Sequence, residues 1–264
     1  MISVKNLFDN DDVKIVEKKG NISVIEYQRD LSVNKFTAMS EYFASKMNVK
    51  RRQVVIQLQD DEYITSAGAM QWMAGNIESK TNIKGVGDFI GKAIKGGVTS
   101  ESTVKPKYHG TGLLALEPTY KYILLEDLDR WNGSIVLEDG LFLACEGTLN
   151  TNVVMRSNLS SAVLGGEGLF NLKLSGKGIA VLESPVPREE LVEIDLQNDQ
   201  IKIDGNMAIA WSDSLNFTVE KSTRSLLGSA VAGEGFVNVY RGTGKILMAP
   251  VRPETTNNIL KYQG

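Results

Sequence analysis

The chain is organised around Gly176-Lys177-Gly178-Ile179-Ala180-Val181-Leu182-Glu183-Ser184-Pro185. Related stretches are Gly110-Thr111-Gly112-Leu113-Leu114-Ala115-Leu116-Glu117-Pro118 and Gly242-Thr243-Gly244-Lys245-Ile246-Leu247-Met248-Ala249-Pro250. The first glycines are residues 110, 176 and 242, so both intervals are 66 residues long. A fixed period of this size indicates tandem structural units. We therefore expect three small related units that share one body.

The composition is that of an ordinary globular protein, with 264 residues, 42% apolar and 23% charged. A net charge of −3 gives no general attraction for nucleic acid, so no nucleic-acid partner is expected. The basic runs Lys18-Lys19 and Lys50-Arg51-Arg52 are typical of solvated turns. The single cysteine, Cys145, fits a reducing compartment. Because no signal-peptide pattern and no apolar run of ~18 residues is found, we expect a cytoplasmic location.

Each unit contains short apolar runs separated by turn residues, which is typical of β-strands. Asp60-Asp61, Asp139-Gly140 and Asp204-Gly205 each lie between two such runs. We predict a hairpin at each, because Asp-Gly suits the positive φ angles of a tight turn. Short helix-like segments closed by glycine follow at 89–97, 159–166 and 226–233.

The N-terminal part adds further elements before the first repeat. Two strands are predicted at Val13–Glu17 and Ile22–Tyr27, and a third at Gln53–Leu58. Between them, apolar residues recur at helical spacing and predict an amphipathic helix over 31–48 whose stripe packs on the core. The stripe consists of Leu31, Phe36, Met39, Phe43 and Met47.

These elements predict an all-β fold with three units about a pseudo-threefold axis, since single units of this size bury little core. The expected division is 1–118 for the first unit with its N-terminal extension and helix, 119–184 for the second, 185–250 for the third, and 251–264 for a C-terminal tail.

Two longer glycine motifs carry a family resemblance. They are Gly165-Gly166-Glu167-Gly168-Leu169-Phe170-Asn171-Leu172 and Ala232-Gly233-Glu234-Gly235-Phe236-Val237-Asn238-Val239, each followed by its Gly-x-Gly. With Ala67-Gly68-Ala69-Met70, they make residues 13 to 250 resemble the family named after altered inheritance of mitochondria protein 24. The first unit departs from the pattern, with Gly96-Gly97-Val98 in place of Gly-Glu-Gly.

The resemblance implies three domains that are each similar to the tryptophan RNA-binding attenuation protein, a double-stranded β-helix type of unit. The mitochondrial branch of the family is associated with inner-membrane organisation, which by analogy suggests scaffolding. Neither tryptophan binding nor RNA binding is implied for this chain, because a shared fold does not carry a site with it.

The repeated carboxylates Glu167 and Glu234 are the candidate ligand contacts. The favoured alternative is that each accepts hydrogen bonds from backbone N–H groups in its glycine-rich turn. The only histidine, His109, cannot build a multi-histidine metal site, and no Gly-x-Ser-x-Gly motif is present. Gly242-Thr243-Gly244-Lys245 lacks the Ser or Thr of a phosphate loop. No catalytic residue, metal or cofactor is therefore predicted.

The leading hypothesis is a non-enzymatic structural or interaction protein that self-associates as a homo-oligomer and has a protein or membrane-surface partner. Met70, Trp72 and Met73 form the candidate partner surface, with core packing as the alternative interpretation. The second hypothesis is a small-ligand binder whose site lies between units and uses Glu167 and Glu234. A hydrolase with a poorly marked site is the third.

Overall fold

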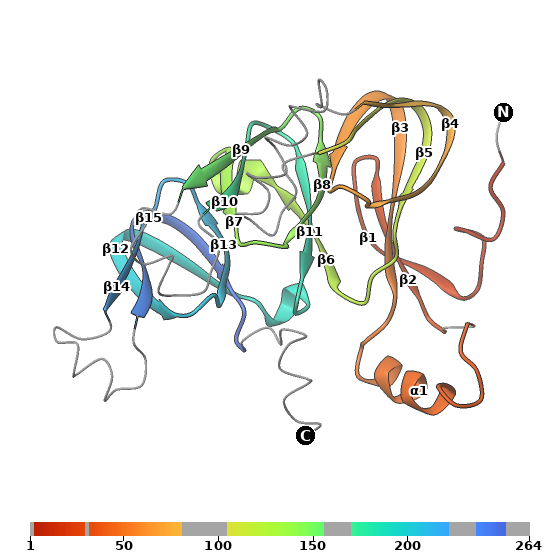
Figure 1. Ribbon diagram of the computed structural model, residues 1–264, viewed down its shortest axis with the longest axis horizontal. Helices are drawn as coiled ribbons and strands as arrows, with labels where there is room; N and C mark the ends of the chain where they lie inside the picture. The colour runs from red at the N-terminus through yellow and green to blue at the C-terminus, as the bar shows by residue number, and fades with distance from the viewer. Residues whose placement is uncertain (1–2, 30–31, 81–104, 156–169, 222–235, 252–264) are drawn as a thin grey trace, which may run out of the picture.

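The computed structural model describes residues 3–29, 32–80, 105–155, 170–221 and 236–251. The three helix-like segments predicted from glycine closures, and with them Glu167 and Glu234, lie outside these residues. Within them the protein is built from β-strands in two curled, barrel-like sheets that lie side by side (Figure 1). The predicted all-β class is confirmed.

The first sheet has the strand order β1-β2-β3-β8-β11-β6, and β5 joins β3 to β4. Its strands are β1 (Val13–Lys19), β2 (Ile22–Tyr27), β3 (Arg52–Thr65), β4 (Met70–Lys80), β5 (Lys107–Leu116), β6 (Tyr122–Asp127), β8 (Phe142–Glu146) and β11 (Ile179–Ser184). All of the pairings in this sheet are antiparallel.

The second sheet has the order β12-β15-β13-β7-β10-β9, and β14 pairs with β15. Its strands are β7 (Ser134–Leu137), β9 (Asn150–Met155), β10 (Phe170–Ser175), β12 (Val192–Asp204), β13 (Ala208–Ser212), β14 (Asn216–Lys221) and β15 (Phe236–Met248). The chain from β6 to β11 contributes strands to both sheets, so the middle of the sequence joins them.

A bulged strand faces the first and the third Gly-x-Gly motif. These bulges contain the left-handed residues Asp60 and Asn198, with φ of 64° and 54°, whereas the second motif faces a turn in which Asn132, with φ of 53°, ends the 3-10 helix η1 (Leu128–Trp131). The residue after each left-handed residue lies opposite the first glycine of a motif, in the strand pairs Asp61–Gly110 and Asp199–Gly242 and in the backbone-bonded pair Gly133–Gly176. An extra residue in one strand increases the local twist and bends the sheet. The period of 66 residues thus marks three places where a left-handed residue precedes the partner of a Gly-x-Gly motif, and two of them are bulged strand pairs.

Close approach of backbone explains the glycines of the first motif. A Cβ on Gly110 would lie 2.0 Å from the carbonyl oxygen of Asn76, and one on Gly112 would lie 2.1 Å from that of Ala74. Gly110 also has a φ of 138°, which side-chain-bearing residues rarely adopt. Only glycine lets β4 and β5 approach this closely at the bend.

The three predicted hairpins were wrong. Asp60-Asp61 is the bulge inside β3. Asp139-Gly140 and Asp204-Gly205 are turns, but β7 and β8 belong to different sheets, and β12 and β13 both pair with β15. Asp and Gly were a sound signal for positive φ, which bulges and sheet-to-sheet turns require as much as hairpins do.

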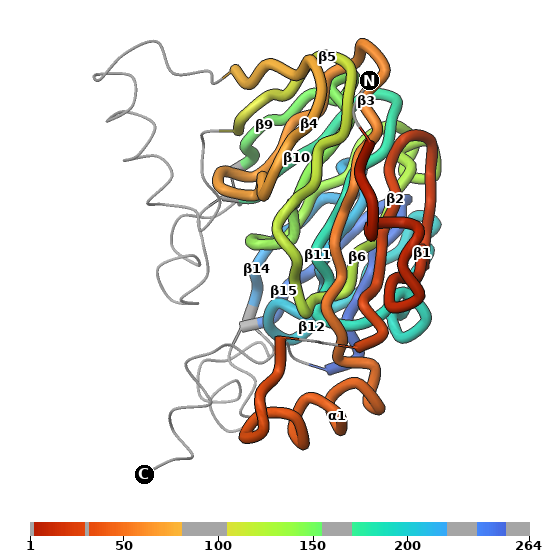
Figure 2. The backbone as a smooth tube through the Cα atoms, turned by 90° about the vertical axis from the view of Figure 1, so that its right-hand side faces the viewer, coloured from red at the N-terminus to blue at the C-terminus, as the bar shows by residue number. Residues whose placement is uncertain are grey.

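The helix predicted over 31–48 is shorter in the structure, where α1 spans Ala38–Lys46. No residue of α1 is buried. The packing of its stripe on the core was also wrong, because Phe36 is 83% exposed and Met47 is 77% exposed. Both views show α1 beside the first sheet and apart from its strands (Figures 1 and 2). Among the described residues, no helix combines the length and apolar character needed to cross a membrane.

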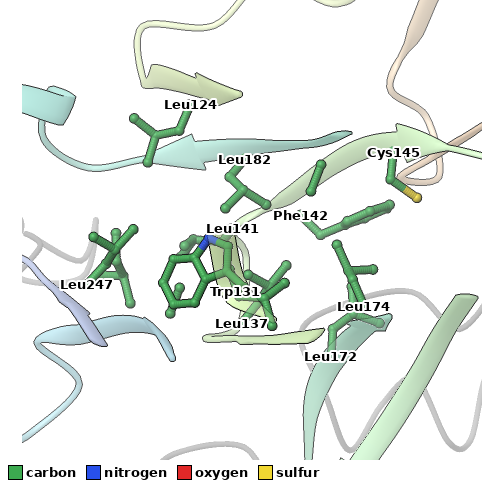
Figure 3. Packing of buried hydrophobic residues seen from close by; sticks show 14 of the residues in the cluster. Leu124, Trp131, Leu137, Leu141, Phe142, Cys145, Leu172, Leu174, Leu182 and Leu247 are labelled. Carbon is green, nitrogen blue, oxygen red and sulfur yellow. The ribbon is translucent and has the colours of Figure 1, made fainter. Parts of the chain in front are cut away.

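The core consists of separate clusters along the two sheets. The cluster shown in Figure 3 combines Leu124 and Leu182 from the first sheet with Leu137, Leu172 and Trp131, so it fills the space where the sheets meet. A second cluster lies within the curl of the first sheet, and a third within the second sheet. Burial of the first cluster, which has side chains from both sheets, holds the two sheets together.

Gly110→Ala is expected to destabilise the protein by about 3 kcal/mol, because it combines an unfavourable φ with a clash against backbone. Gly140→Ala is the matched control, since Gly140 has a φ of 79° but no atom within 4 Å of an added Cβ. Its cost is expected to be about 1 kcal/mol, from backbone strain alone. Urea unfolding measures both. Equal costs would contradict the role given to close backbone approach.

Candidate functional site

The first sheet closes on itself at the seam between β1 and β6. There the Lys19 side chain donates a hydrogen bond to the backbone oxygen of Leu125. A cleft of about 220 Å³ opens at this seam, and we call it the seam cleft. It is lined by Val16, Glu17, Val24, Glu26, Asn48, Arg52, Tyr122, Ile123, Pro187, Arg188 and Glu189. Its volume is below the roughly 300–1,000 Å³ of typical drug-sized ligand sites, so it suits only a small molecule.

Arg52, at the start of β3, is the central cation of the seam cleft. Its guanidinium lies 2.8 Å from the Glu26 carboxylate and 4.2 Å from the centre of the Tyr122 ring. It also donates to the backbone and side-chain oxygens of Asn48 at 3.1 and 3.0 Å. The side chain is 5% exposed, so the solvated turn predicted for Lys50-Arg51-Arg52 was wrong for Arg52.

A second ion-pair network approaches from the 3-10 helix η2 (Arg188–Glu190). Arg188 lies 3.6 Å from Glu126 and 2.6 Å from Glu193. Glu126 is 2% exposed and accepts a hydrogen bond of 3.0 Å from the indole N–H of Trp131, in the 3-10 helix η1 (Leu128–Trp131). Arg188 thus joins the cleft to the core cluster and to β12.

The carboxylates of this region have pKa values shifted in opposite directions. Burial raises the pKa of Glu17 above its ordinary value, and the nearby Lys19 only partly offsets this. Burial also acts to raise the pKa of Glu26, but hydrogen bonds and charges from Lys50, Arg52 and Gln28 outweigh it and lower the pKa. Burial therefore dominates at Glu17 and ion pairing at Glu26.

The chemistry available at the seam cleft is recognition of charge. Its guanidinium groups and carboxylates suit a small polar ligand with groups of both signs. In the part of the chain that the structure describes, no group of three or more His, Cys, Asp or Glu side chains is placed to hold a metal ion.

The residues singled out from the sequence lie elsewhere. Met70 packs against the core of the first sheet, Trp72 packs against a smaller cluster on the outer face of that sheet, and Met73 is 41% exposed. They therefore do not form one continuous apolar patch. His109 is exposed on β5. Cys145 is fully buried, and burial raises the pKa of its thiol to about 12.

The seam cleft was missed because its charges come from segments far apart in the sequence. No sequence motif links Glu26, Arg52 and Arg188, which stand far apart along the chain. The basic run that contains Arg52 was the only available signal, and its burial became visible only with the paired strands β2 and β3 in place.

A scan against family models matches residues 45–251 to the family described as Mitochondrial biogenesis AIM24. The chain belongs to this family. The glycine motifs had indicated the same family, so that prediction is confirmed. An uncharacterised protein of Streptococcus pyogenes serotype M6 is 28% identical over 201 residues, which are 74% of this chain and 79% of the relative.

A crystal structure of a Streptococcus pyogenes protein from a structural genomics programme shows the same fold. It is 25% identical to this chain and superposes with a TM-score of 0.61. The match covers 83% of this chain and 96% of that one, so the arrangement of both sheets is shared.

Arg52→Met is expected to destabilise the protein by about 3 kcal/mol, because it leaves the Glu26 carboxylate buried without its closest partner. The double variant with Glu26→Gln is expected to lose clearly less than the sum of the two single variants. Urea unfolding of all four proteins completes the cycle. Additive losses would show that the two side chains act independently.

The loss of stability at acid pH is expected to depend on Glu193. Hydrogen bonds from Lys245 and Arg188 lower its pKa from 4.5 to about 2. A carboxylate whose pKa is lower in the folded state than in the unfolded state stabilises the protein at pH values above the unfolded-state pKa. This contribution is lost as the pH falls toward 2. Between pH 5 and pH 2, Glu193→Gln should therefore flatten the decline of the urea midpoint. Glu190→Gln, an exposed carboxylate in η2, is the control and should leave the decline unchanged.

Proposed function

We propose that this chain is a non-enzymatic interaction protein that self-associates through the free edge of β4. This strand is 11 residues long and pairs with β5 along one side. Within the described residues no strand pairs with its other side. Unpaired N–H and C=O groups along such an edge are a template for pairing with another chain.

The side chains of β4 support a contact in its first half rather than its second. Trp72 is half-buried and Met73 is 41% exposed there, whereas the far end carries the exposed charges Glu78 and Lys80. Apolar groups beside an open edge add hydrophobic contact to strand pairing. A homo-oligomer held in this way suits a scaffold in the cytoplasm.

The finer arrangement that we propose is three units of the kind found in the tryptophan RNA-binding attenuation protein. Its support is the recurrence at each of the three repeats of a left-handed residue one position before the residue opposite the first glycine, in a bulge at the first and third repeats and in a turn at the second. Equivalent bends give equivalent unit shapes, and stacking of such units buries a continuous core.

Small-ligand binding is the second candidate function, and the seam cleft favours it. The cleft lies between β1 to β3 of the first predicted unit and Tyr122 and Arg188 of the following two. We infer a small zwitterion as the ligand class, since cations and carboxylates both line the cleft. Amino acids that raise the melting temperature of the protein, but not of Tyr122→Ala, would support this candidate.

Met73→Lys is expected to shift the protein from oligomer to monomer, because an edge lysine opposes strand pairing between copies. Val4→Lys is the matched control, since Val4 is 37% exposed and lies outside the sheets. Light scattering after size-exclusion chromatography gives the mass of each. A monomeric wild-type protein, or an unchanged Met73→Lys oligomer, would contradict the proposed assembly.

A further inference from the structure

The solvent-facing side of α1 is the most exposed apolar surface among the described residues. The four most exposed large apolar side chains are Phe36, Met47, Met39 and Phe43, at 83%, 77%, 73% and 61%. Tyr42 lies beside them at 57% and contacts Phe43 edge to face. We call these five residues the α1 stripe. A contiguous group of this kind on a folded chain indicates an interaction surface.

The helix is attached to the body through its opposite side. The Tyr120 hydroxyl donates to Glu41 at 3.4 Å and accepts from Arg51 at 3.0 Å. Glu41 and Ser45 face a small space that Arg51 and Tyr120 also line. At 100° per residue, Met39 and Phe43 lie far around the helix from Glu41. The polar side therefore fixes α1, and the α1 stripe points outward.

The charges at the borders of the α1 stripe are positive. The Lys35 ammonium lies 4.9 Å from the centre of the Phe36 ring, and the Lys46 ammonium lies 5.1 Å from that of Tyr42. The helix's acidic residue, Glu41, lies on the attached side. Long basic side chains beside an apolar face can keep their charge at headgroup level while that face enters the acyl region.

We propose that the α1 stripe is a peripheral docking site for an anionic lipid bilayer. A nine-residue helix is only about 14 Å long, so its outer face is far smaller than the ~800 Å² per partner of a stable protein dimer. Pairing two copies in antiparallel fashion would also bring Lys35 of one helix toward Lys46 of the other. A flat anionic surface meets neither difficulty, because it contacts only the outward face and attracts both lysines.

Co-sedimentation of the full chain with vesicles tests this site. The wild-type protein is expected to bind vesicles of phosphatidylcholine with phosphatidylglycerol, and to bind phosphatidylcholine alone more weakly. Phe43→Ser should lower partitioning about tenfold, because one buried phenylalanine is lost. Lys46→Glu should reduce binding to the anionic vesicles only. Because α1 has no buried residue, both variants should keep the wild-type melting temperature.

Phe8→Ser is the matched control, since Phe8 is 46% exposed and lies outside α1. It should bind as the wild-type protein does. Failure of the wild-type protein to bind anionic vesicles, or unchanged binding by Phe43→Ser, would overturn the docking site. Loss of oligomers by Phe43→Ser without lipid would also overturn it, by showing that a second copy covers the α1 stripe. None of these vesicle results depends on the free edge of β4, which Met73→Lys tests separately.

Discussion

Close backbone approach at the first Gly-x-Gly motif shapes the first sheet. At Gly110 and Gly112 the backbone of the neighbouring strand occupies the space of a side chain. The bulged partner strand supplies an extra residue and the twist that turns the pair. A bulge also faces the third motif in the second sheet, although a Cβ on Gly242 would lie 3.5 Å from the nearest backbone atom, so the close backbone approach is specific to the first motif.

The curling of the first sheet also creates its functional surfaces. It brings the edges of β1 and β6 together, so Glu26, Arg52 and Arg188 meet at a seam although they are far apart in the sequence. The hydrogen bond from Lys19 to Leu125 crosses this seam, and the ion pairs Arg52–Glu26 and Arg188–Glu126 lie beside it, so removal of one partner would leave a buried charge unpaired. The connection from β2 to β3 is left outside the curl, and it carries α1 with its exposed stripe.

Sequence patterns predicted the features that are fixed locally. The 66-residue period located the three left-handed sites, and the apolar runs located β1, β2 and the first part of β3. Positive φ was predicted correctly at Asp60 and Gly140. The hairpins predicted from it were wrong, because the conformation of one residue does not show which strands will pair. For α1, helical spacing identified an apolar face but not the side on which that face lies. Glu41 and Tyr120 decide this, and they are 79 residues apart.

The candidate site was predictable only in its general position. A site between units was expected, yet its charges, including the buried Arg52, depend on tertiary contacts that a short basic run does not reveal. The expected carboxylates Glu167 and Glu234 lie outside the described residues, so their roles stay predictions. Absence of a recognisable catalytic motif in the sequence led to the interaction hypothesis, and the free edge of β4 gives that hypothesis a location.

Native mass spectrometry of the protein purified from its own host tests whether this chain is an assembling interaction protein. We predict an oligomer whose mass is a whole multiple of the 28.9 kDa chain, with no additional mass. A monomer that carries a small molecule released on denaturation would contradict it and would favour ligand binding instead.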